Sequence, residues 1–94
     1  LRRDDLRTLI ELQVRESWLG VAEADARRAT TREAVEQAEE NLRISRELYG
    51  AGLVTHTQVL DAIALRIAAV NNRDDAQFDA ELARLRLSRA IGEL

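Results

Sequence analysis

The stretch YGAGLVTHTQ, residues 49–58, decides the fold because it contains a signal that ends one helix and a signal that starts another. Gly52 is placed to take the left-handed conformation that follows a helix end, which glycine adopts at little steric cost. Thr55 and Gln58 form a capping box, in which each side chain accepts a hydrogen bond from the other residue's backbone N–H. Since the stop and the start lie only a few residues apart, the two helices must run antiparallel.

Apolar residues on both sides of the turn are spaced so that their side chains can contact each other across it. Val54 precedes the predicted cap and Val59 lies one turn beyond it, the arrangement of a hydrophobic staple. Leu48 and Leu53 occupy the positions whose side chains meet in a Schellman motif at a helix end.

Composition on both sides of this turn favours helices. The 94 residues include no Pro and only four Gly, and 46% are hydrophobic, whereas the β-branched and aromatic clusters of strands are missing. We therefore predict an all-α fold, a long antiparallel two-helix coiled-coil hairpin with helices over about 3–50 and 56–91. It forms a single domain over residues 1–94. A compact three- or four-helix bundle, with breaks near Thr30 and Asn71, is the alternative.

The first predicted helix carries two rows of residues at intervals of seven, the spacing of coiled-coil packing. One row is mostly large and the other is small, which lets a neighbouring helix approach closely. The large row is Val14, Val21, Arg28, Val35, Leu42 and Tyr49, and the small row is Ile10, Ser17, Ala24, Thr31, Ala38 and Ser45. Ion pairs four residues apart are predicted on the outer face, namely Glu11–Arg15, Glu23–Arg27 and Glu39–Arg43.

The second predicted helix has more apolar surface than one partner helix can cover. The stripe expected to carry its packing is Leu60, Ala64, Ile67, Asn71, Asp74, Phe78, Leu82 and Leu85. A second row comprises Val59, Ile63, Val70, Ala80, Leu87 and Ile91. Four members of the second row, Ile63, Val70, Leu87 and Ile91, would stay exposed in a monomer. We therefore expect the isolated chain to self-associate, with hairpins pairing into a four-helix bundle.

Catalytic and metal-binding motifs are missing from the sequence. There is no Cys and a single histidine, His56, whose position in the first turn of a helix makes it an ordinary polar residue. Ser–His–Asp, glycine-rich phosphate-binding and HExxH patterns are missing as well. We expect no enzyme activity, no catalytic or metal site and no cofactor. Nucleic acid is not an expected partner, because the net charge is −3 and both signs are interspersed. No apolar run approaches the roughly 20 residues that span a bilayer.

The turn and its flanks resemble the TolC-like outer membrane factors, the outer membrane efflux protein family. The similar stretch begins at Val35 and reads VEQAEENLRISRELYGAGLVTHTQVLDA, and Arg89-Ala90-Ile91-Gly92 resembles the end of the family's closing helix. Members of that family are homotrimers with a membrane β-barrel and a long periplasmic helical barrel. The resemblance implies that this chain is one periplasmic hairpin, of the second repeat, excised from a larger channel subunit of the outer membrane.

The same resemblance implies sites and partners. The turn Gly50, Ala51, Gly52, Leu53, Val54 and Thr55 would form the entrance tip, which docks a periplasmic adaptor protein joined to an inner-membrane pump. Tyr49 and Asp61 match positions that hold the family's entrance closed. The sequence departs from the pattern because Val54 occupies the place of an Arg and Gln58 that of another acid, which predicts a less tightly held gate.

Two other functions remain open. The chain could be the helical hairpin of a periplasmic adaptor (membrane fusion) protein, or a generic coiled-coil interaction module. The adaptor tips carry an Arg followed four residues later by Leu, whereas here Arg46 is followed by Gly50 and Arg43 by Glu47. Efflux or type I secretion by a channel is therefore the leading hypothesis.

Overall fold

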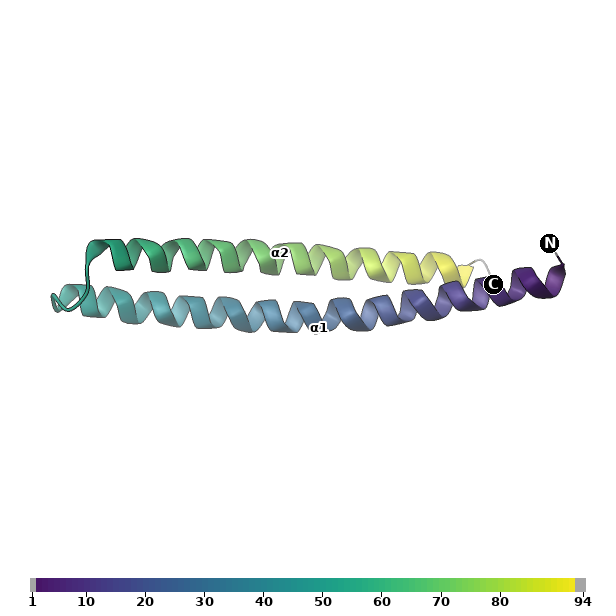
Figure 1. Ribbon diagram of the computed structural model, residues 1–94, viewed down its shortest axis with the longest axis horizontal. Coiled ribbons are helices and arrows are strands. Elements are labelled where there is room, and N and C mark those ends of the chain that lie inside the picture. The colour runs from purple at the N-terminus through teal and green to yellow at the C-terminus, as the bar shows by residue number, and fades with distance from the viewer. Residues whose placement is uncertain (1, 93–94) are drawn as a thin grey trace. The chain divides into compact units, whose positions relative to one another are not determined.

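The computed structural model describes residues 2–92 and confirms the predicted hairpin. Helix α1 spans Arg3–Gly50 and helix α2 spans His56–Gly92, and residues 2–92 contain no strand. The two helices run antiparallel and are joined by one short turn (Figure 1). Neither helix is interrupted at Thr30 or Asn71, so the alternative of a three- or four-helix bundle is wrong.

The hairpin divides into two compact parts. We call Ala29–Asp75 the turn segment, and the described residues of the other part, 2–28 and 76–92, the terminal segment. In each of them a piece of α1 lies beside a piece of α2 (Figure 1).

The end of α1 is a Schellman motif, as predicted. Gly52 has a φ of 75°, in the left-handed region that favours glycine. The Leu53 N–H donates to the Leu48 carbonyl oxygen at 2.8 Å, and the Gly52 N–H donates to the Tyr49 carbonyl oxygen at 2.9 Å. These two bonds satisfy carbonyl groups that the helix itself leaves without a donor.

The start of α2 is the predicted capping box. The Thr55 N–H donates to Gln58 Oε1 at 2.8 Å, and the Gln58 N–H donates to Thr55 Oγ1 at 3.2 Å. Val54 packs against a cluster that includes Val59, which confirms the staple. The expected apolar contact of Leu53 covers little of that side chain, because 72% of the residue is exposed.

The core of the turn segment is a small apolar cluster. Leu42 of α1 packs with Val59 and Ala62 of α2, and Val54 and Ile63 cover its edge. Burial of a large aliphatic side chain contributes about 1.5–3 kcal/mol. A salt bridge from Arg66 to Glu39, at 3.7 Å, crosses between the helices beside this cluster.

The core of the terminal segment is built on α2 almost entirely from alanine. The buried residues are Ala76, Ala80, Ala83 and Ala90. The α1 residues of both predicted rows in this segment are only partly buried, among them Val14, Val21 and Ala24. Because alanine adds so little volume, the α1 side chains can pack close to the α2 backbone.

Salt bridges also join the two helices of the terminal segment. Arg27 contacts Asp79 at 2.5 Å, and Arg84 contacts Asp25 at 2.9 Å. These side chains are about half exposed, so the bridges contribute little stability and mainly favour one register of the helices.

Two predicted ion pairs within α1 are wrong. Glu11 contacts Arg7 rather than Arg15, and Glu39 contacts Arg66 of α2 rather than Arg43. Several partners lie within reach of an exposed charge on a helix and differ little in energy, so sequence spacing does not select one.

The heptad rows of α1 face α2 as predicted. Every member of the two rows is buried or partly buried except Tyr49, which is 48% exposed and lies beside the turn.

The packing face predicted for α2 is wrong. In the turn segment Leu60 and Ile67 are 50% and 53% exposed, and in the terminal segment Phe78 and Leu85 are 61% and 66% exposed. The second apolar row supplies part of the packed face instead, since Val59 and Ala80 are buried. Of the four residues expected to stay exposed, Ile63, Val70 and Leu87 are partly buried and Ile91 is exposed. Both faces are apolar at the same period, and the face with the smaller residues fits better against the bulky row of α1.

Glycine substitutions should test the turn. Gly52→Ala should destabilise the hairpin by about 1–2 kcal/mol, because a Cβ opposes the left-handed conformation. Gly20 lies inside α1 and serves as the control, since nothing lies within 4 Å of the position that an added Cβ would occupy. Gly20→Ala should stabilise the chain by about 0.8–1 kcal/mol through helix propensity. Urea melts of both variants measure the two shifts, and shifts of the same sign would contradict this assignment of the turn.

Candidate functional site

The turn offers a small, uncharged surface. Residues 50–53 and Thr55 are exposed, and Val54 is partly buried. The N–H groups of Gly52, Leu53 and Thr55 are already used by the Schellman motif and the capping box. Leu53, 72% exposed, is the one large side chain on this surface. The turn can therefore bind a partner through shape and apolar contact, but it presents no charge to a ligand.

An aromatic contact joins the end of α1 to the start of α2 beside the turn. The rings of Tyr49 and His56 lie 5.6 Å apart and are inclined at 49°. Such a tilted pair contributes roughly 0.5–1 kcal/mol beyond the area that it buries. This contact was not predicted, because the sequence indicates only an ordinary helix-start residue at His56. The available signal was the presence of one ring on each side of a tight turn.

The two predicted gate residues do not meet within one chain. Tyr49 is 48% exposed, and Asp61 is exposed on α2 next to the buried Ala62. Among residues 2–92 no hydrogen bond joins Tyr49 to Asp61, and the ring contact of Tyr49 is with His56. Both side chains are accessible to a neighbouring molecule, so their role as a gate stays a prediction.

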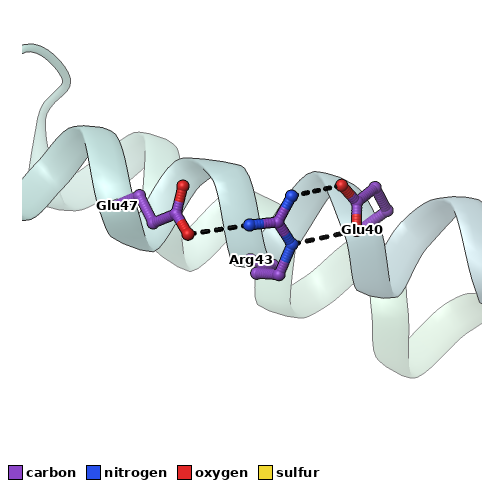
Figure 2. Close-up of polar contacts among 3 residues, drawn as sticks. All are labelled: Glu40, Arg43 and Glu47. Carbon is purple, nitrogen blue, oxygen red and sulfur yellow. Dashed lines mark hydrogen bonds and ion pairs between the residues drawn. The ribbon is translucent and has the colours of Figure 1, made fainter.

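A cluster of three charged residues lies on α1 close to the turn. Figure 2 shows Arg43 between Glu40 and Glu47, one turn before and one turn after it. Its Nε and Nη2 donate to the two carboxylate oxygens of Glu40 at 3.0 and 2.5 Å, and its Nη1 donates to Glu47 at 2.7 Å. The hydrogen bonds from Arg43 lower the pKa of Glu40 below its usual 4.5, and the two carboxylates raise the pKa of Arg43.

This cluster borders a shallow groove of about 450 Å³ in the turn segment. The groove is lined by Glu39, Leu42, Arg43, Arg46, Glu47 and Arg66. Its acidic and basic groups nearly balance, and most of them pair with each other across or along the helices. The groove therefore favours neither an anion nor a cation, and the cluster stabilises helix α1 near its end.

Within the described residues, side chains with reactive chemistry are not gathered anywhere. No polar or charged residue among residues 2–92 is buried as a whole. No group of three or more His, Cys, Asp or Glu in this range could hold a metal ion. Neither described helix has a stretch apolar enough to span a bilayer. The surfaces that remain as candidates are interaction surfaces, namely the turn and the apolar outer side of α2.

Comparison of the chain with models of protein families, with characterised proteins and with solved structures finds no significant match.

The Arg43 cluster should make the stability of the hairpin depend on pH. A carboxyl group whose pKa is lowered on folding contributes stability above its unfolded pKa, and the contribution is lost as pH falls through the lowered folded value. Glu40→Gln should therefore lower the melting temperature at pH 7, and its effect should diminish as pH falls through the lowered pKa of the folded state.

The control for this measurement is Glu36→Gln, an exposed change on the same helix. Melting curves followed by circular dichroism at several pH values give the comparison. If Glu40→Gln and Glu36→Gln show the same dependence on pH, the Arg43 cluster does not stabilise the helix.

Proposed function

We propose that this chain is the periplasmic helical hairpin, from the second repeat, of a TolC-like outer membrane channel subunit. The subunit forms a homotrimer that serves efflux or type I secretion, and the hairpin acts by assembly rather than by catalysis. Residues 50–55 form the entrance tip and dock a periplasmic adaptor, which links the channel to an inner-membrane pump. The whole protein resides in the outer membrane, with this segment in the periplasm.

The observation that carries the proposal is that α2 is apolar on two sides. In the terminal segment its packed face consists of Ala76, Ala80 and Ala83, while Phe78 and Leu85 are exposed on its outer side. A helix that is hydrophobic around most of its circumference is normally buried between several neighbours. A helix in the wall of a barrel has such neighbours, because it packs within its own hairpin and against adjacent hairpins.

The outer side of α1 near the turn differs from that of α2. It carries the charged residues of the Arg43 cluster, whose side chains are more than half exposed. By contrast, Leu60, Leu65 and Ile67 lie half exposed on α2 of the same segment. This difference supports a hairpin with one side toward solvent and another toward protein, as barrel assembly requires.

The turn supports the docking role through its shape. The Schellman motif and the capping box hold Leu53 outward, 72% exposed, on a surface made otherwise of small residues. An apolar side chain held on a rigid turn is suited to a pocket between partner helices. The resemblance of residues 49–62 to the family's turn supplies the identity of that partner, a periplasmic adaptor.

Docking can be tested at Leu53 in the full-length channel. Leu53→Asp should weaken cysteine crosslinking to the adaptor by about tenfold or more and lower drug resistance, because it places a charge in an apolar contact. Leu53→Met keeps apolar volume and should retain both activities, whereas Gly52→Val, which strains the turn, should lose them. Trimer formation is checked in each variant. Normal crosslinking and resistance in Leu53→Asp would remove the turn from the docking surface.

The gate can be tested by conductance. In the trimer, three copies of Tyr49 and Asp61 would surround the entrance, and a hydrogen bond from Tyr49 would contribute about 1 kcal/mol per subunit. Tyr49→Phe combined with Asp61→Ala should therefore raise conductance in planar bilayers. Tyr49→Phe combined with Asp5→Ala removes the same charge elsewhere on the chain and is the control. A Tyr49/Asp61 double variant that conducts like the parent would show that the gate lies elsewhere.

A generic coiled-coil interaction module is the second candidate, and the same two-sided apolar character of α2 favours it. The docking experiment separates the two. An interaction module would lose its partner when the side of α2 is changed, and substitutions in the turn would have no effect on binding.

A further inference from the structure

Helix α2 in the terminal segment has its large and small apolar residues on unexpected sides. An ordinary amphipathic helix packs its large residues inward. Here the packed positions Ala76, Ala80 and Ala83 are at most 8% exposed, whereas Phe78 and Leu85 are 61% and 66% exposed. The large side chains of Phe78 and Leu85 therefore remain available to another molecule.

The exposed residues form a second coiled-coil seam along α2. Phe78, Leu82, Leu85 and Arg89 follow one another at spacings of four, three and four residues, which puts them on one side of a helix. We call these four residues the outer strip. Leu82 is partly buried and the other three are exposed.

Charges beside the outer strip change sign along the helix. Asp79 and Arg86 lie seven residues apart and therefore on the same flank of the strip, next to Phe78 and Leu85. Both are exposed, and the Asp79 side chain remains 54% exposed in its salt bridge with Arg27. An acidic position followed by a basic one makes this flank complementary to its own reversed copy.

We propose that the outer strip binds the outer strip of a second copy of this chain in antiparallel orientation. In the register of an antiparallel coiled coil, Leu82 lies opposite Leu85 of the second copy and Phe78 lies opposite Arg89 of the second copy. The same register brings Asp79 beside Arg86 of the second copy. The two-fold symmetry of the pair forms each of these contacts twice.

Charge selects both the partner and the orientation. A parallel pair would place Arg89 against Arg89 of the second copy inside the seam, where like charges oppose association. The antiparallel pair places each Arg89 over the ring of Phe78, a favourable cation–aromatic contact. A partner helix must offer a basic residue beside Asp79 and an acidic residue beside Arg86, and a helix with another sequence of charges would pair with only one of them.

This pairing differs from the self-association expected from the sequence. The sequence predicted association through Ile63, Val70, Leu87 and Ile91. The first three of these residues are partly buried within the hairpin. The pairing does not rest on the proposed channel function, since it concerns the free chain and residues away from the turn.

Sedimentation equilibrium on the complete chain tests the pairing. The parent should be a dimer, and Leu85→Glu should weaken dimerisation by roughly tenfold or more, because it puts a charge into the seam. Ile44→Glu is the matched control, since Ile44 is a large exposed apolar residue (41% exposed) on α1 of the turn segment, outside the outer strip. It should leave the dimer unchanged. A monomeric parent, or equal weakening by both substitutions, would overturn the proposal.

Charge reversal tests the orientation with substitutions of exposed residues. Arg86→Asp alone should weaken the dimer, because the new acid lies beside Asp79 of the second copy. Asp79→Arg alone should weaken it, because the new base lies beside Arg86 of the second copy. An equimolar mixture of the two variants should form a heterodimer with an affinity within about threefold of the parent, because both pairs between the two copies are again of opposite charge. The Asp79→Arg variant also loses its own bridge to Arg27, so its affinity is compared before and after mixing. Circular dichroism confirms that each variant is helical. If mixing restores no association, the antiparallel register is wrong.

Discussion

The left-handed backbone at Gly52 is the constraint on which the rest of the hairpin depends. It allows the Leu53 N–H to turn back to the Leu48 carbonyl oxygen, so α1 ends without leaving its last carbonyl groups unsatisfied. The chain then reverses, and Thr55 starts α2 through its exchange of hydrogen bonds with Gln58. Because so few residues separate the helices, the turn also sets which residues of α1 and α2 lie beside each other, beginning with Leu42 and Val59.

The small residues of α2 determine how the two helices share their apolar surface. Alanines at intervals of seven, from Ala62 through Ala76 to Ala90, are buried or nearly so. Their small side chains leave room for the bulky row of α1. Larger residues of α2, such as Phe78 and Leu85, are exposed instead. A two-helix unit packed in this way buries little apolar area for its size. Its outer surface therefore keeps apolar area exposed, which is the basis of the proposed role in assembly.

The polar groups of the hairpin complement this arrangement. Exposed charges form pairs along α1, as at Arg43, or between helices, as at Arg84 and Asp25. Such pairs add modest stability and keep parts of the surface soluble. The turn, in contrast, is uncharged and holds Leu53 outward. The uncharged turn and the charged outer side of α1 beside it are therefore different surfaces of the turn segment.

Local chemistry explains why so much of the fold could be read from the sequence. The Schellman motif, the capping box and the staple each involve residues at most five apart, so their spacing alone predicts the helix ends at Gly50 and His56. The heptad rows of α1 could also be predicted, because their spacing of seven is sustained from Ile10 to Tyr49. The exposed Tyr49 and the turn could be proposed as sites, but only through resemblance to a family.

The tertiary structure alone decided which side of α2 faces α1. Its two apolar rows have the same period, so hydrophobic pattern could not separate Phe78 and Leu85 from Ala76 and Ala83. The choice depends on volume, since the alanine side fits against the large side chains of α1 and the other side does not. The partners of Glu39 and the contact of Tyr49 with His56 were likewise settled only when the helices came together, because both join residues on different helices.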